Sequence, residues 1–203
     1  RYPVFLAATA NSMANINLDM GNLDEALAMF NVTCEESTRA DDFYFTVYGL
    51  HGLGRVYMHQ ERGAEAADML QRALHLAEQH EHPLHVSNSL TELATFHFRS
   101  GNLDEAEALS TRALAIREQH HLLNGAVTNC LRLADIRGKR SERTEARRLL
   151  TRALAIAPRH VPVAQHILTV WPRGTLPSGC SARLVGPALR RPLPEVGGGV
   201  GKL

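Results

Sequence analysis

The sequence is poor in cysteine and has no long apolar run. Its three cysteines, Cys34, Cys130 and Cys180, are far apart and odd in number, which argues against a disulfide framework and favours a reducing compartment. No apolar run approaches the roughly 20 residues that a membrane-spanning helix needs, and no charged-then-apolar segment marks a secretory leader. The chain begins at Arg1 without a methionine, so we expect a fragment of a longer protein. We predict a cytoplasmic location and no membrane partner.

The sequence also lacks a large excess of positive or of negative charge, which weakens the case for a nucleic-acid partner. The formal net charge is +1. The densest basic stretch is interrupted by Asp135, Glu142 and Glu145, and no aromatic residue interleaves to stack on bases. Its members are Arg137, Lys139, Arg140, Arg143, Arg147, Arg148 and Arg152. We predict a solvated outer helix face, with binding of nucleic acid or an acidic partner as the alternative.

Motifs for nucleotide binding and covalent catalysis are lacking. The glycine-rich segment 197–202 has Val196 where a phosphate-binding loop needs its first glycine, and no Ser or Thr follows Lys202. No Ser or Cys has a base and an orienting partner at a suggestive spacing. Cys34 and Cys130 lie on apolar stripes, where a buried, unreactive thiol is expected. We predict that the chain is not an enzyme, has no catalytic residues and uses no cofactor.

What the sequence does contain is an internal repeat with a period of forty positions. The hexapeptide Gly-Asn-Leu-Asp-Glu-Ala occurs at 21–26 and again at 101–106. Steps of one period from Ala106 reach three further alanines, Ala26, Ala66 and Ala146. Four units in one phase without a gap predict a repeat architecture in which each unit stacks on its neighbours.

Each unit has the pattern of two helices. In the third unit, apolar residues recur at helical spacing over 90–97 and the pattern stops at Gly101, which accepts the left-handed conformation that ends a helix. Asp104 and Glu105 follow in the first turn of the next helix, where the helix dipole favours negative charge. The small Ala106 on the apolar stripe of this second helix would let the two helices approach closely.

Histidines are the remaining candidates for a metal site. His80, His82 and His85 cluster in one connection between units and His120-His121 in the next, which would suit zinc. His80 and His120 hold the same position of the repeat, however. A histidine at a helix C-terminus interacts favourably with the last carbonyls and the dipole. We favour this capping role and predict no metal site.

The repeat resembles the tetratricopeptide repeat (TPR), with Leu-Gly or Leu-Ala in the first helix, a glycine turn, then Ala, a bulky residue and Ala in the second. The resemblance covers about residues 4–158. The units are longer than the roughly 34 residues usual in this family, and the proline that normally ends the second helix is present only as Pro158, so we expect that helix to run on. Such long repeats resemble those of kinesin light chains, spindle-orientation adaptors and bacterial regulators of the maltose-activator type.

The resemblance implies an all-α fold, a right-handed superhelical solenoid of antiparallel helix pairs with four repeats and a partial capping helix. We place the repeats at about 1–40, 41–80, 81–120 and 121–158. Their helices are predicted at about 4–20 and 23–39, 43–60 and 64–80, 84–100 and 103–120, and 122–138 and 142–157. Residues 159–171 are predicted to form a partial fifth helix or cap. Residues 172–203, rich in Pro, Gly and Arg, are predicted to be a disordered tail.

In this family the first helix of each pair lines the concave face, so the resemblance also places a partner-binding groove. Asn and Thr side chains there can hydrogen-bond an extended peptide backbone, and Arg55 can pair with a carboxylate. Asn11, Thr91 and Glu92 stand where chaperone-binding relatives carry a basic clamp, so that function is disfavoured. The predicted groove residues are Asn11, Asn15, Tyr48, His51, Arg55, Asn88, Thr91, Thr95, Thr128, Leu131 and Asp135.

Two functions follow from the resemblance. The first is a protein–protein interaction scaffold that holds a peptide or a helix of another protein in the groove. The alternative is a sensor or regulatory segment of a bacterial signal-transduction protein or transcriptional regulator, acting on its own ATPase or DNA-binding domain.

Overall fold

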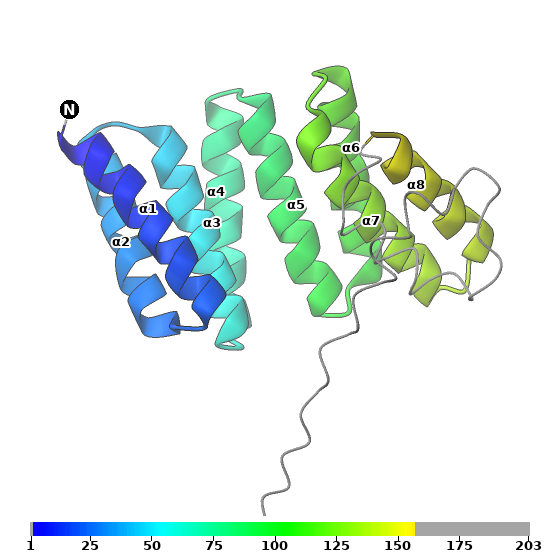
Figure 1. The fold of residues 1–203 in the computed structure, drawn as a ribbon, viewed down its shortest axis with the longest axis horizontal. Coiled ribbons are helices and arrows are strands. Elements are labelled where there is room, and N and C mark those ends of the chain that lie inside the picture. The colour runs from blue at the N-terminus through cyan, green and yellow to red at the C-terminus, as the bar shows by residue number, and fades with distance from the viewer. Residues whose placement is uncertain (1, 157–203) are drawn as a thin grey trace, which may run out of the picture.

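The computed structural model describes residues 2–156, which form eight α-helices and, within that range, no strand (Figure 1). The helices are α1 (Tyr2–Met20), α2 (Leu23–Arg39), α3 (Phe43–His59), α4 (Gly63–Gln79), α5 (Pro83–Arg99), α6 (Leu103–Gln119), α7 (Leu123–Lys139) and α8 (Arg143–Ile156). The all-α fold is confirmed, and every helix end lies within two residues of its predicted position. The predicted fifth helix at 159–171, the predicted tail at 172–203, Pro158 and Cys180 lie outside the described residues.

Seven short turns of the same kind join the helices and set the period of the chain. Each contains one residue in the left-handed conformation: Gly21, Asp41, Glu61, Glu81, Gly101, His121 and Ser141. These residues stand at every twentieth position. Only two are glycines, both with φ of 82°, and the other five residues have φ between 47° and 64°. The sequence predicts a stop at the glycines, whereas the same stop occurs at Asp, Glu, His and Ser.

The hydrogen bonds of these turns explain how one residue ends a helix and starts the next. In the fifth turn, the amide of Asn102 donates to the carbonyl of His97 (2.9 Å), and the carbonyl of Asn102 accepts from the amide of Ala106 (3.1 Å). The first bond closes the Schellman motif that follows a left-handed residue. The equivalent bond is present in all seven turns of the described chain. The second helices therefore run on to these turns, as expected without a proline, and the left-handed residue ends them there.

The eight helices form four antiparallel pairs that stack in a row (Figure 1). We call α1, α3, α5 and α7 the first helices and α2, α4, α6 and α8 the second helices. Consecutive first helices contact one another along the backbone, whereas no such contact joins consecutive second helices in residues 2–156. The first helices therefore lie on the inner, concave side of the solenoid, as the resemblance implied.

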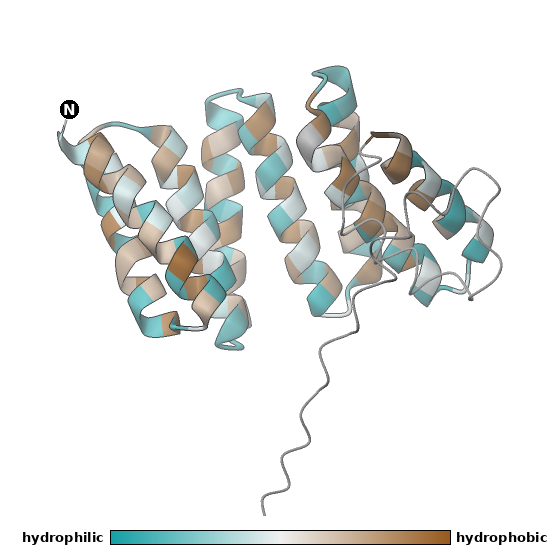
Figure 2. Cartoon of the chain, in the orientation of Figure 1, coloured by the Kyte–Doolittle hydropathy of each residue, from teal (hydrophilic) through white to brown (hydrophobic). Residues whose placement is uncertain are grey.

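Small and apolar side chains on both helices of each pair form a core that continues from one pair to the next. Figure 2 shows that hydrophobic residues recur along the helices instead of gathering in one segment. The four periodic alanines, Ala26, Ala66, Ala106 and Ala146, are fully buried. One core cluster joins Ala14 and Leu18 of α1, Phe30 of α2, and Leu53 and Val56 of α3. Each pair thus completes its core against its neighbour.

The turn geometry yields a stability test with two glycines. Gly101→Ala should lower the free energy of unfolding by about 1 kcal/mol, because an L-residue is strained in the left-handed conformation and the gain from a less flexible unfolded chain offsets only part of that cost. Gly138 lies inside α7, and nothing lies within 4 Å of a Cβ added there. Gly138→Ala should therefore raise the free energy of unfolding by about 0.5–1 kcal/mol. Urea unfolding measures both, and shifts of the same sign would contradict the assigned turn.

The close approach of α5 and α6 yields a second test. Ala106 is 0% exposed, so Ala106→Leu should destabilise the chain by about 1–3 kcal/mol through overpacking. Ala108 lies on the exposed side of the same helix, and Ala108→Leu should leave the melting temperature nearly unchanged. Equal melting temperatures for the two variants would refute the proposed helix contact.

Candidate functional site

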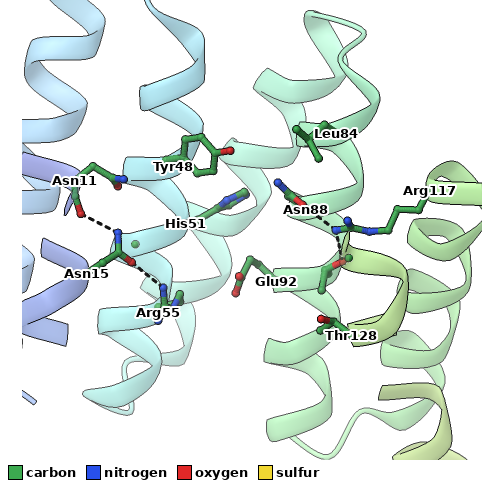
Figure 3. Close-up of a pocket in the computed structure, with 13 residues that line it drawn as sticks. Asn11, Asn15, Tyr48, His51, Arg55, Leu84, Asn88, Glu92, Arg117 and Thr128 are labelled. Carbon is green, nitrogen blue, oxygen red and sulfur yellow. Dashed lines mark hydrogen bonds between the residues drawn. The ribbon is translucent and has the colours of Figure 1, made fainter. Parts of the chain in front are cut away.

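Polar side chains from all four first helices line a cavity of about 580 Å³ (Figure 3). The lining residues are Asn11 and Asn15 of α1, Tyr48, His51, Gly52 and Arg55 of α3, Leu84, Asn88, Thr91 and Glu92 of α5, Arg117 of α6, and Gly125 and Thr128 of α7. Eight of the eleven predicted groove residues are in this set. Their role in binding stays a prediction.

A ladder of hydrogen bonds connects these first helices across the concave face. Each bond joins a side chain of one first helix to a side chain 37 to 40 positions later on the next. The four pairs are Asn15–Arg55 (3.1 Å), His51–Ser89 (2.8 Å), Thr91–Asn129 (3.0 Å) and Thr95–Arg132 (3.1 Å). The period of the repeat thus places partners side by side, and it holds the polar side chains in fixed positions.

Three predicted groove residues do not line the cavity. The hydroxyl of Thr95 accepts a hydrogen bond from Arg132 at 3.1 Å. Leu131 is half-buried and packs against the core cluster between α7 and α8. Asp135 lies on the same helix as Arg132 and interacts with it electrostatically. The cavity therefore ends before the C-terminal half of α7.

The sequence prediction missed five lining residues, Gly52, Leu84, Glu92, Arg117 and Gly125. Of these, Arg117 belongs to a second helix, which the prediction did not consider. Its side chain is only 4% exposed. Nη2 donates to Oδ1 of Asn88 at 2.8 Å and lies 3.4 Å from the hydroxyl of Thr91, and Figure 3 shows the guanidinium beside Asn88. Nε is buried and has no hydrogen-bond partner. Burial lowers the pKa of this guanidinium, which nevertheless keeps its charge.

A glycine on the next helix makes room for this arginine. A Cβ at Gly125 would lie 1.6 Å from Nη1 of Arg117, so no other residue fits there while the guanidinium keeps its place. The sequence carries a signal of this exchange. One and two periods before Arg117 stand the small Ala77 and Ser37, and one period before Gly125 stands the larger His85. From one period to the next, the small Ala77 is thus replaced by the large Arg117, and the large His85 by Gly125. This paired change in side-chain size marks the site.

The charges around the cavity are unevenly paired. Arg55 donates to Asn15 and lies 3.9 Å from a carboxylate oxygen of Asp19. Burial raises the pKa of the Glu92 carboxyl, and the charges of Arg55 and Arg132 act in the opposite direction. Arg117 has no carboxylate within 4.0 Å among residues 2–156. The cavity thus holds two cations and one carboxyl group.

Two buried histidines near the cavity stay neutral at pH 7. Burial, together with His85 and Arg55, lowers the pKa of His51 to about 3. Burial, together with His82, lowers the pKa of His85 to about 4, although Asp42 acts in the opposite direction. His85 lies among the rings of Tyr44, Tyr48 and His82, with centroids 4.7 to 5.2 Å away. Neither ring nitrogen of His85 has a hydrogen-bond partner.

The histidines and cysteines that the sequence suggested for metal binding or catalysis lie at positions that the fold accounts for. His80 and His120 directly follow α4 and α6, as the capping interpretation requires, and residues 2–156 contain no group of three or more His, Cys, Asp or Glu side chains that could hold a metal ion. Cys34 is half-buried and Cys130 is buried, and both are free thiols. Burial raises the pKa of each to about 11, so neither is a reactive thiolate.

The basic stretch only partly matches its prediction. Arg137 and Arg140 are each 27% exposed and both pair with Glu107 of α6, so they belong to the contact between helices and not to a solvated face. Arg152 on α8 is more exposed and pairs with Glu118. These intramolecular carboxylates reduce the positive charge that a nucleic acid would meet.

The sequence matches the family model of the MalT-like TPR region over residues 4–172. The chain belongs to this TPR family. The match extends beyond α8 and includes the whole of the predicted partial repeat at 159–171. No curated protein matches the sequence. Among residues 2–156, this TPR chain has no helix with the length and hydropathy of a membrane span.

Several solved structures share the fold at low sequence identity. A Rap protein complexed with competence and sporulation factor has a TM-score of 0.76 and 17% identity, over 82% of this chain and 47% of that one. A putative kinesin light chain with TPR-like repeats from Podosopora anserina has a TM-score of 0.65 and 18% identity, over 93% and 90%. A signal-transduction ATPase (STAND) with a TPR sensor from Pyrococcus horikoshii has a TM-score of 0.62 and 15% identity, over 83% and 25%. The TPR chain spans less than two thirds of the Rap and ATPase chains, and these identities show the fold alone.

The buried histidines predict a loss of stability in acid. The unfolded chain takes up a proton on each histidine near pH 6.5, whereas folded His85 resists protonation to about pH 4. The unfolded state thus binds more protons between these values, so the free energy of unfolding should decrease as pH falls from 6.5. His85→Phe should reduce this slope by up to about 1.4 kcal/mol per pH unit.

The control for this test is His75→Phe, at an exposed position of α4, which should keep the slope of the wild type. Urea unfolding at several pH values between 4 and 7 gives the slopes directly. A His85→Phe slope equal to that of the wild type would contradict the neutral, buried state of this histidine.

Proposed function

We propose that this TPR chain binds an extended peptide segment of a partner protein in the cavity between the first helices. The observation that carries the proposal is the cavity lining, in which Asn11, Asn88 and Thr128 bring amide and hydroxyl groups from three of the four helix pairs to one surface. Packed helices lie about 8–10 Å apart, and an extended chain advances about 3.3 Å per residue. Polar groups from neighbouring first helices would thus meet about every third peptide residue.

The cavity has a volume of about 580 Å³. It lies within the range of about 300–1,000 Å³ that is usual for ligand sites. A Rap protein of the same fold was solved with competence and sporulation factor, so this architecture can hold a second molecule. This supports a binding role for the present chain.

Arg55 provides a test of the cavity as the binding site. Pools of random decapeptides are selected on the full 203-residue chain, and the affinity of an enriched peptide is measured by fluorescence anisotropy. Arg55→Glu should weaken binding at least about tenfold, because it removes the bond to Asn15 and adds a charge beside Glu92 and Asp19.

The matched control is Arg72→Glu, which makes the same charge change at an exposed position of α4 and should leave the affinity unchanged. Circular dichroism confirms that both variants are folded. Full affinity of the Arg55→Glu variant would place the ligand elsewhere.

A second candidate function is a sensor segment of a larger regulator that acts on its own ATPase or DNA-binding domain. The observations that favour it are the match to the MalT-like TPR region and the likeness to the TPR sensor of a signal-transduction ATPase. The full reading frame from which the chain derives tests it. An ATPase or helix-turn-helix domain in that frame would support this candidate, and a frame with repeats alone would exclude it. A cytoplasmic location is proposed for either function.

A further inference from the structure

Arg117 has features that packing alone does not explain. At the equivalent positions of the first two helix pairs, the same turn is completed by Ser37 and Ala77, both 0% exposed. Arg117 instead brings a charge into the interior, at a place where burial of a cation is costly without a counter-ion. Because the solenoid stacks with small residues here, the arginine is not required by the fold.

The guanidinium has donors left over for a ligand. Its described partners, Asn88 and Thr91, are neutral and both contact Nη2. Nη1 makes no hydrogen bond in the described part of the chain and, unlike Nε, is not among its buried unpaired atoms. No ion pair involves this side chain there. Arg55, the other cation of the cavity, lies 3.9 Å from Asp19. Arg117 is thus the cavity cation whose charge is not offset by a neighbour.

We infer that Arg117 anchors a carboxylate of the bound peptide at the α5–α7 end of the cavity, an inference that rests on the proposed peptide-binding function. The planar guanidinium presents several N–H donors in a geometry that matches a carboxylate. Thr128, exposed on α7, adds a hydroxyl to the same lining. Figure 3 shows Arg117 and Thr128 on one side of the cavity, and Glu92 on α5 nearer the middle.

The charge balance favours a carboxylate over a phosphate group. The site offers a single unpaired guanidinium, and Glu92 lines the same cavity. A monoanion offsets the one positive charge, whereas a dianion would leave excess negative charge close to Glu92. The carboxylate belongs either to the C-terminus of the peptide or to an Asp or Glu side chain, and the chemistry of the contact is the same for both.

Four peptide pools separate these sources. Acetylated random decapeptides are prepared with a free C-terminal carboxylate or a C-terminal amide, each with or without Asp and Glu. The pools are selected on the full chain and counted by mass spectrometry. We expect enrichment only from pools that contain a carboxylate. Enrichment confined to the free-acid pools assigns the terminal carboxylate, and enrichment of amidated pools with Asp or Glu assigns the side chain.

Two arginine variants test the anchor. Arg117→Met keeps the apolar stem and removes the charge, and it should weaken binding of the enriched peptides roughly 10- to 100-fold, as expected for lost hydrogen bonds to a charged group. Arg112→Met removes an exposed arginine of the same helix and should have no effect. Arg117→Lys, which keeps the charge but not the fork, should give an intermediate loss and serves if Arg117→Met does not fold.

The outcomes distinguish this inference from the function on which it rests. Equal enrichment of uncharged and charged pools, with full binding by Arg117→Met or by Arg117→Lys, overturns the anchor and leaves peptide binding intact. Displacement of the peptides by inorganic phosphate but not by acetate, at equal ionic strength, overturns the assignment to a carboxylate. Failure of every pool to bind overturns the proposed function and the anchor with it.

Discussion

The left-handed residue at every twentieth position is the constraint on which the rest of the structure depends. It ends each helix, and the amide of the next residue closes the turn, so helix length and direction repeat without drift. Residues one period apart therefore occupy equivalent places in successive pairs. The buried alanines from Ala26 to Ala146 and the ladder that begins with Asn15 and Arg55 both follow from this equivalence. A turn one residue longer would rotate the next helix by about 100° and break both.

The helix positions were predictable because their phase is carried by many residues and not by the turns alone. Five of the seven left-handed positions hold residues other than glycine, and Glu61, Glu81 and His121 among them give no strong turn signal. Their strain, roughly 1–2 kcal/mol each, is tolerated because the packing on both sides fixes the chain. The fully buried Ala66 and Leu70 of α4 illustrate that packing. The second helices do run on without a proline, as expected, and the left-handed turn is what ends them.

The candidate site was predictable only where it follows the period. First-helix residues such as Asn11 and Asn88 reach the cavity because the concave face is fixed by the fold. Arg117 could not be placed in this way, because it reaches the cavity from a second helix past Gly125. His51 lies at a predicted position, but it is only 6% exposed and hydrogen-bonds Ser89. Periodicity identifies the face, whereas the reach of a side chain depends on the size of its neighbours.

The concave side also concentrates polar atoms that the fold leaves unsatisfied. Oδ1 of Asn11, Oδ1 of Asn129 and Nε of Arg117 are buried without partners, at a typical cost of about 1–3 kcal/mol each. Apolar residues in their places would avoid this cost, as the buried Leu53 and Leu93 do on neighbouring first helices. Of these three residues, Asn11 and Arg117 line the cavity. A peptide of the proposed kind that moved the side chains around them and completed their hydrogen bonds would recover part of this cost on binding.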